Sequence, residues 1–135
     1  MRLSSRGDDE MLGWVEICIG AADAKLGRDT GAFYVGDVLG ISDWFVVTSA
    51  PSQRQVRAIV DEVEEKLSEA NGPKPTRIEG KDTLSWVLMD YGFFVVHVFT
   101  DEAREYYDLE RLWQDVPNFA GTADLAEPDA AVIEL

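Results

Sequence analysis

The chain has 135 residues, of which 46% are hydrophobic and 10% aromatic, so it is long and apolar enough for one folded domain and is not a disordered chain. Its formal net charge of −14 disfavours direct binding of DNA or RNA, because nucleic acids are held mainly by Lys and Arg, and it favours a basic protein surface as partner. No apolar run approaches the roughly 20 residues that span a bilayer and the N-terminus lacks an apolar signal segment, so we expect a cytoplasmic protein without a membrane partner.

The first predicted element is a helix that begins at Met11 and stops at Gly27. Residues 1–10 are polar and charged and are expected to form a flexible arm, in which Asp8 or Asp9 provides the helix cap. The apolar residues that fall at helical spacing are Val15, Cys18, Ile19, Ala22 and Leu26.

Two short strands are predicted next, over residues 32–38 and 43–49, on either side of the segment 39–42. Both strands are rich in aromatic and β-branched residues. The second is apolar at the consecutive positions 44–47, a pattern typical of a strand that is covered on both faces. We therefore predict an α/β fold with helices on either side of the sheet.

A second helix is predicted after Ser52, because Ser52 and Gln55 form the S-x-x-Q pattern of a capping box. The helix ends at Asn71-Gly72-Pro73. Its apolar stripe consists of Val56, Ile59, Val60, Val63 and Leu67. The opposite face is acidic, and we interpret it as a solvated helix face in preference to a binding surface. Its acidic residues are Asp61, Glu62, Glu64, Glu65 and Glu69.

A β-hairpin is the clearest local signal in the sequence. Its strands run over residues 84–89 and 93–99 and are joined by Asp90-Tyr91-Gly92, where glycine suits a left-handed turn position. Thr100 is predicted to cap a last helix that extends to Pro117. The apolar positions of that helix are Ala103, Tyr106, Leu109, Leu112 and Trp113.

Together these elements indicate one α/β domain over residues 11–117. Its core is a mixed sheet of about four to five strands flanked by helices. The remaining residues, 118–135, form an acidic tail that we expect to be mostly disordered.

Catalytic equipment is sparse. Cys18 is the only cysteine and His97 the only histidine, so a disulfide and a multi-ligand zinc site are both unavailable, and we interpret both side chains as structural. The turn Ser49–Arg54 has the position of a phosphate cradle, and with Asp43 or Asp90 holding magnesium it would suit a nucleotide-binding or nucleotidyltransferase-like enzyme. The turn lacks the glycines and the lysine of a P-loop, so a simple capped turn is favoured, and no catalytic residue, metal or cofactor is expected.

Strand alternation places Trp86, Leu88 and Asp90 on one face of the first hairpin strand. Either a helix covers this face, or the face is an exposed hot spot for a protein partner, rimmed by Asp90 and Tyr91. Spacing alone favours the covered face.

An ordered series of motifs makes the hairpin region recognisable. The series is Glu79-Gly80, Trp86-Val87-Leu88-Met89-Asp90-Tyr91-Gly92, Val95-Val96-His97-Val98-Phe99 and Arg104-Glu105-Tyr106-Tyr107-Asp108-Leu109-Glu110-Arg111-Leu112-Trp113. Two upstream segments, Ile41-Ser42-Asp43-Trp44-Phe45-Val46-Val47 and Arg54-Gln55-Val56, extend it. Over about residues 12–117 the sequence closely resembles the ribosomal silencing factor family, also called Iojap-like.

The resemblance implies an α/β fold topologically like that of nucleotidyltransferases, without their activity. It implies a factor that binds a large-subunit ribosomal protein, the one numbered fourteen, at the intersubunit face and sterically prevents the small subunit from joining. Translation is thereby lowered when nutrients are scarce. The family often self-associates off the ribosome, which makes a homodimer of the free protein one expectation. Beside the ribosome-binding factor and the nucleotidyltransferase-like enzyme, a third interpretation is an acidic adaptor for another basic protein.

The resemblance also points to a partner surface on the hairpin. Its aromatic and leucine side chains would anchor the partner and its carboxylate would meet basic side chains. Where the family commonly has Gly-Asp after the turn, this chain has Gly92-Phe93, which removes a carboxylate and adds an apolar group at the rim. The proposed partner-binding residues are Trp86, Leu88, Asp90, Tyr91 and Phe93.

Other motif residues are assigned a structural role. The family's usual Leu-Asp-Val pattern is replaced by Val35-Gly36-Asp37-Val38, so the resemblance assigns no role to Asp37. The residues expected to hold the sheet against the last helix are His97, Tyr107, Glu110 and Trp113.

Overall fold

The structure is a computed structural model that describes residues 6–35, 43–109 and 111, with the side chains of residues 6–9 left undescribed. In chain order its elements are α1 (Arg6–Ala24), β1 (Arg28–Tyr34), β2 (Trp44–Ala50), α3 (Gln53–Glu69), β3 (Arg77–Glu79), β4 (Trp86–Asp90), β5 (Phe94–Thr100) and α4 (Asp101–Tyr107). Within the described ranges, no helix is long and apolar enough to cross a membrane.

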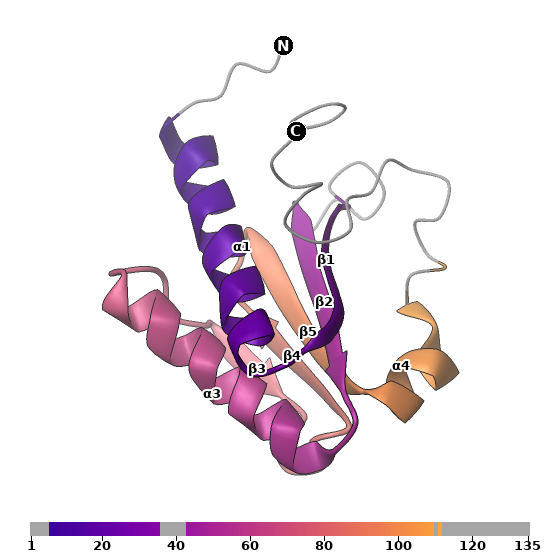
Figure 1. Ribbon diagram of the computed structural model, residues 1–135. Coiled ribbons are helices and arrows are strands. Elements are labelled where there is room, and N and C mark those ends of the chain that lie inside the picture. The colour runs from indigo at the N-terminus through magenta and orange to yellow at the C-terminus, as the bar shows by residue number, and fades with distance from the viewer. Residues whose placement is uncertain (1–5, 36–42, 110, 112–135) are drawn as a thin grey trace.

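The five strands form one mixed sheet in the order β1-β2-β5-β4-β3. The central strands β2 and β5 are parallel, and the other neighbouring pairs are antiparallel. Figure 1 shows α1 and α3 side by side over one face of this sheet. The predicted α/β class with a mixed sheet flanked by helices is therefore confirmed.

Two apolar clusters lie on the two faces of the sheet, which we name by what covers them. The inner face packs against α1 and α3 and includes Val46, Val96 and Met89. The outer face is the opposite one, where Phe45, Val47 and Phe99 form the second cluster. All seven residues of β2 are buried, as its consecutive apolar positions predicted.

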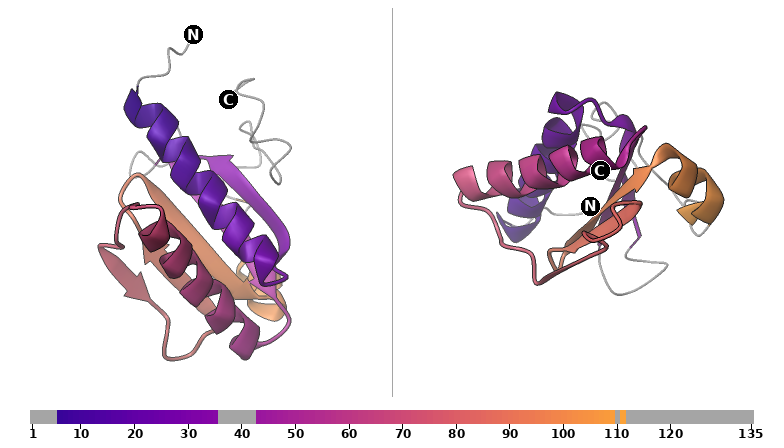
Figure 2. Two further views of the ribbon diagram at one scale, coloured as in Figure 1. Left: turned by 60° about the vertical axis from the view of Figure 1, so that its left-hand side comes forward. Right: turned by 90° about the horizontal axis from the view of Figure 1, so that it is seen from below.

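The helices are not divided evenly between the two faces. Both long helices lie on the inner face, whereas α4 lies apart from them, beyond the end of β5, as the right-hand view of Figure 2 shows. Within the described residues, the helical cover of the outer face is limited to this last segment, because Ala103 of α4 and the following Leu109 pack on that cluster. The expectation of helices on either side was thus correct only in this limited sense.

The first helix extends beyond its predicted limits at one end and stops short at the other. It begins at Arg6, inside the segment expected to be an arm, so Asp8 and Asp9 are helical and neither is the cap. The placement of Leu26 on the apolar stripe was also wrong, because Leu26 is 75% exposed and has a left-handed backbone with φ 65°. Gly27 does end the helix, since its backbone N–H donates to the carbonyl oxygen of Ala22 at 2.7 Å.

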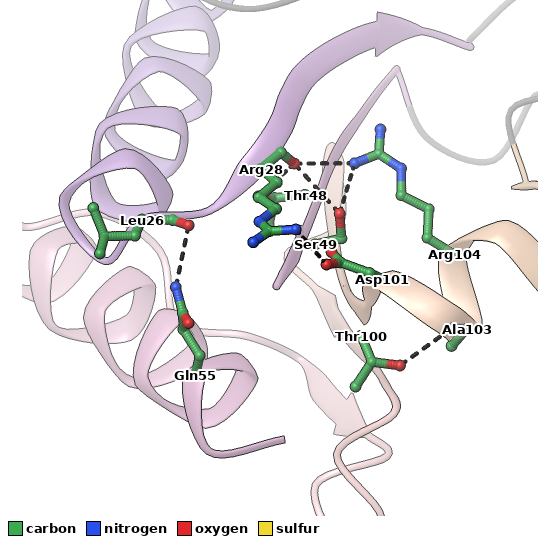
Figure 3. Close-up of polar contacts among 9 residues, drawn as sticks. All are labelled: Leu26, Arg28, Thr48, Ser49, Gln55, Thr100, Asp101, Ala103 and Arg104. Atoms are coloured by element: carbon green, nitrogen blue, oxygen red, sulfur yellow. Dashed lines mark hydrogen bonds and ion pairs between the residues drawn. The ribbon is translucent and has the colours of Figure 1, made fainter. Parts of the chain in front are cut away.

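Helix α3 begins as predicted but uses only half of the capping box. The hydroxyl of Ser52 accepts a hydrogen bond from the backbone N–H of Gln55. The side chain of Gln55 does not turn back to Ser52. It donates instead to the carbonyl oxygens of Lys25 and Leu26, the two residues that follow α1, and Figure 3 shows the bond to Leu26. Gln55 therefore satisfies carbonyl oxygens just beyond the end of one helix from the first turn of another.

The total of five strands lies within the predicted four to five, but the bounds of β1 differ from the prediction and β3 was not located. Strand β1 covers residues 28–34, earlier than the predicted 32–38, and Asp37 lies outside the described residues. Strand β3 has only three residues and was not predicted from sequence. The hairpin is confirmed, with a loop of residues 91–93 in which Gly92 has φ 91°.

Helix α4 is shorter than expected. Thr100 caps it as predicted, but the helix ends at Tyr107 because Asp108 is left-handed. Tyr106, expected on the apolar side, is 80% exposed. The remaining predicted positions, Leu112 and Trp113, lie outside the described residues, as does the acidic tail.

Candidate partner-binding surface

The register of the hairpin places three of the five predicted contact residues on the outer face. Trp86 pairs with Phe99, Leu88 with His97 and Asp90 with Val95. Their side chains are half-buried, and they alternate along β4 with the fully buried Val87 and Met89. The alternation predicted from sequence is therefore present, and it leaves each of the three partly accessible.

Trp86 is fixed in place by other rings. Its indole stacks on Phe99 with ring centroids 4.9 Å apart, and the ring of Tyr107 in α4 contacts it at the same centroid distance. The indole N–H donates a hydrogen bond of 3.1 Å to Nδ1 of His97. Such a side chain has little rotamer freedom left to lose on binding a partner.

His97 is a structural residue, as expected. It is buried between Phe45 and Trp86, and desolvation lowers its pKa to about 4, so its ring is neutral at neutral pH. Because Nδ1 accepts from Trp86, the proton resides on Nε2, which is buried without a hydrogen-bond partner. Cys18 is likewise buried, and burial raises the pKa of its thiol, which keeps the thiol unreactive.

Asp90 already has a cationic neighbour. Nε of Arg77 lies 3.4 Å from its carboxylate, and Nη1 of Arg77 lies 2.9 Å from the carboxylate of Glu79. The other oxygen of Asp90 accepts the backbone N–H of Gly92 and thereby shapes the hairpin loop. Arg77 could not be identified from sequence, because the short polar strand that carries it has no periodic pattern.

The remaining two predicted contact residues, Phe93 and Tyr91, lie in different environments. Phe93 is 65% exposed at the hairpin loop. Tyr91 is only 5% exposed, because its ring stacks on Phe94 in the cluster beneath α1 and α3. The expectation that Tyr91 rims the Trp86 face therefore needs correction: its side chain belongs to the opposite side of the sheet.

The residues considered for an enzyme do not form one site. The segment Ser49–Arg54 begins with the last two residues of β2 and continues past its C-terminal end, whereas Asp43 precedes its first residue. Asp90 lies at the same end as Asp43, since Asp43 is hydrogen-bonded to Phe93 of the hairpin loop. The seven residues of β2 separate the two ends by about 20 Å. A phosphate held by the turn would be out of reach of either carboxylate.

Comparison with known proteins places this fold in a family. A family model described as "Ribosomal silencing factor during starvation" matches residues 8–133 of the chain. The chain belongs to the ribosomal silencing factor family.

Individual relatives agree with this assignment. The ribosomal silencing factor RsfS of Bacillus subtilis is 38% identical over 103 residues, which cover 76% of this chain and 86% of the relative. A crystal structure of a Chromobacterium violaceum protein matches with a TM-score of 0.72 and 33% identity, covering 85% of this chain and 97% of that one. A mouse protein named for mitochondrial assembly of the ribosomal large subunit is 34% identical over 88 residues, which cover 64% of this chain and 39% of the mouse protein.

The motif glycine Gly80 directly supports the strand that begins with Trp86. Its φ is 93°, and a Cβ at this position would lie 2.0 Å from the carbonyl oxygen of Trp86. Any other residue would push the start of β4 away or strain the turn before it. The glycine therefore belongs to the structural support of the candidate surface.

The motif residue Arg104 fastens α4 to the far end of the sheet. Its Nη1 donates to the carbonyl oxygen of Arg28 at 3.1 Å and to the hydroxyl of Ser49 at 3.2 Å (Figure 3). The guanidinium of Arg28 in turn contacts Asp101 of α4 at 2.8 Å. These contacts hold α4 so that Tyr107 lies against Trp86, which fits the structural role predicted for Tyr107 and His97. Glu110 and Trp113 lie outside the described residues.

Proposed function

We propose that this protein represses translation by binding the large ribosomal subunit and preventing the small subunit from joining it, when nutrients are limiting. The partner is the large-subunit ribosomal protein numbered fourteen, at the intersubunit face. The protein acts by binding, in the cytoplasm, and catalyses no reaction. Membership of the ribosomal silencing factor family supports the ribosome as the target, and the name of the mouse relative supports the large subunit.

The observation that carries the proposal is the preorganised Trp86 on a half-buried face. Trp86 and Leu88 offer adjacent apolar area, and Trp86 is held by ring contacts with Phe99 and Tyr107. Aromatic anchors of this kind dominate the binding energy of protein interfaces, because they bury much area and lose little entropy. Phe93 extends the apolar surface toward the hairpin loop.

The charge of the surface suits a basic partner. Arg77 is shared between Asp90 and Glu79, so the group has one more acid than base. An exposed ion pair of this type contributes only about 0–1 kcal/mol, so a Lys or Arg of the partner can replace Arg77 at modest cost. We therefore retain Asp90 among the proposed partner-binding residues and exclude Tyr91, because its buried side chain lies on the other side of the sheet.

Charge reversal at Asp90 tests the proposal. Wild-type protein added to separated subunits should reduce the fraction of joined ribosomes in a sucrose gradient. Asp90→Lys should raise the concentration needed for half-maximal inhibition about tenfold or more, because it places a cation against a basic partner. Glu16→Lys makes the same charge change at an exposed site on α1 and should leave inhibition unchanged.

Two further measurements complete this test. Trp86→Ala should also abolish inhibition, and its circular dichroism spectrum separates loss of the anchor from loss of the fold. Sedimentation of the free protein tests the homodimer that we propose for it off the ribosome. Unchanged subunit joining with wild-type protein in excess refutes the proposal. A pull-down dominated by some other basic protein would favour an adaptor role.

A further inference from the structure

Two tyrosines of α4 are exposed next to Trp86. Tyr106 is 80% exposed and Tyr107 is 53% exposed. Their rings meet edge to face with centroids 5.0 Å apart, and the ring of Tyr107 also contacts Trp86. A single exposed aromatic side chain is common on protein surfaces, whereas a contiguous group of them indicates a binding surface. The sequence pattern placed Tyr106 on the apolar side of the helix, so this exposure is a finding of the structure.

The tyrosines continue the row of accessible side chains along β4. Because β4 and β5 are antiparallel, Trp86 at the start of β4 pairs with Phe99 near the end of β5, and α4 follows β5 directly. The order along the surface is therefore Asp90, Leu88, Trp86 and then the two tyrosines. Asp90 and Trp86 lie about 13 Å apart along the strand, and the ring contacts of 4.9 Å and 5.0 Å lengthen the row to about 20 Å.

Carboxylates occur at both ends of this row. At the β4 end, Asp90 shares one base with a neighbouring glutamate. At the α4 end, Glu102 and Glu105 are exposed, and Glu102 lies one helical turn from Tyr106. Within the described residues, neither Glu102 nor Glu105 forms a salt bridge. Aromatic and leucine side chains separate the two acidic ends.

The bases on and near α4 have partners within the protein. The guanidinium of Arg28 contacts Asp101 at 2.8 Å. Nε of Arg111 lies 3.1 Å from the carboxylate of Asp108. Arg104 donates its hydrogen bonds to the sheet. The α4 end therefore presents net negative charge, which repels the phosphates of RNA and attracts the basic side chains of a protein.

We propose that the partner surface extends from β4 onto Tyr106 and Tyr107, and that the protein segment bound there is basic at both ends and apolar between them. This inference rests on the proposed function and specifies the kind of ribosomal-protein segment that it requires. An extended segment of about six residues spans the 20 Å row. Its middle side chains pack on the apolar groups of β4.

Each basic end of the segment meets a different part of the row. One cation replaces Arg77 beside Asp90, as proposed above. The other lies against the face of the Tyr106 ring, where the ring electrons attract a cation, and is close to Glu105. Two separate charge contacts fix the direction of the segment and its position along the row, which a single contact at Asp90 leaves free.

Co-sedimentation of full-length variants with purified large ribosomal subunits tests the aromatic contact. Tyr106→Ala should weaken binding about tenfold, because it removes an aromatic contact from the interface. Tyr106→Phe keeps the ring and should bind within about twofold of wild type. Leu26→Ala removes a similarly exposed apolar side chain beyond the end of α1 and should change nothing. If Tyr106→Ala binds as the wild type does, the inference is refuted and the proposed function stands.

Charge reversal tests the two ends by the same measurement. Glu105→Lys and Asp90→Lys should each weaken binding about tenfold, and the double variant about a hundredfold, because independent contacts add in free energy. Glu16→Lys, at an exposed site on α1, should bind as the wild type does.

The other outcomes of this measurement count against the inference. Tighter binding of Glu105→Lys would show that this end meets ribosomal RNA. A double variant no weaker than Asp90→Lys would show one cation in place of two. Equal weakening by Glu16→Lys would show general attraction to an acidic protein. Wild-type protein that does not bind the large subunit would refute the proposed function together with this inference.

Discussion

His97 illustrates how one buried side chain couples the fold to pH. Its Nδ1 receives the indole N–H of Trp86, and the rest of the ring is enclosed by Phe45 and Phe99. A second proton would have to occupy Nδ1, which would break the Trp86 hydrogen bond and create a desolvated charge. The position of Trp86 on the proposed partner surface therefore depends on a neutral histidine.

We predict that His97 causes stability to fall with acidification between about pH 6.5 and pH 4. Its folded pKa of about 4 lies below its ordinary value of 6.5, so in this window the unfolded chain binds the extra proton and is favoured. The contribution is complete above pH 6.5, and its loss amounts to about 3 kcal/mol by pH 4.

Urea unfolding of wild type and His97→Gln at several pH values measures this loss. Glutamine keeps an acceptor for Trp86 but does not titrate, so the difference between the two proteins isolates the histidine from the many carboxylates. Parallel stability curves for the two proteins between pH 7.5 and 4 would show that His97 titrates normally in the folded state.

The unpartnered hydroxyl of Tyr91 makes a second prediction at this scale. Tyr91→Phe keeps the ring that stacks on Phe94 and removes an Oη atom that has no hydrogen bond. The free energy of unfolding, measured by urea titration, should rise by about 1 kcal/mol, because folding no longer desolvates a polar group that gains no hydrogen bond in return. A fall of similar size would mean that the hydroxyl has a partner in solution.

Among the elements, α1 ends in a strained way. Leu26 occupies the left-handed position after the helix, with its side chain exposed, and the backbone N–H groups of Leu26 and Gly27 bond back to Asp23 and Ala22. This bonding pattern is the one that helices usually close with a glycine at the left-handed residue. Here the glycine follows one position later.

We predict that Leu26→Gly stabilises the protein by about 1 kcal/mol, because glycine adopts this backbone without the steric cost of a Cβ atom. Thermal or urea unfolding measures the gain. Leu26→Ala retains the Cβ and serves as the control, so it should give little of the benefit. Equal stabilisation by both substitutions would attribute the effect to removal of an exposed apolar side chain.

The elements differ in how far the sequence predicts them, for physical reasons. Helix α3 and the β4–β5 hairpin were predictable, because each combines a local end signal with a clear apolar periodicity. Ser52 caps the helix, and Gly92 forms the turn of the hairpin. Strand β3 has three residues and is stabilised by pairing with β4 alone, so local sequence holds no signal for it. The end of α1 was predicted wrongly at Leu26, because the spacing of apolar residues cannot show that the φ angle becomes positive there.

The candidate surface, like the elements, was predictable from sequence only where local pattern decides the outcome. Strand alternation correctly put Trp86, Leu88 and Asp90 on one face, since parity is a local property of a strand. The neutralisation of Asp90 by Arg77 and the burial of Tyr91 were not predictable, because both depend on which elements pack together in three dimensions. The motif series identified the family, but only the fold separates its structural residues from those left accessible.

At the scale of the whole molecule, the sheet is assembled from distant parts of the chain. The central parallel pair joins Trp44 to Phe94, and the chain forms α3, β3 and β4 between these two residues. The contacts of Arg28 with Asp101 and Arg104 span an even longer stretch of sequence. Neither half of the chain therefore contains a complete core.

The position of β2 has a consequence for biosynthesis. Its seven residues are all buried in the finished protein, yet one of its two neighbours, β5, is made 50 positions later, as the pairing of residue 44 with residue 94 shows. At about 5–20 residues per second, a nascent chain carries this apolar strand with one edge open for roughly 3–10 seconds. During that interval the strand can be captured by chaperones or can pair with another chain, so slower translation of residues 45–94 should lower the yield of folded protein.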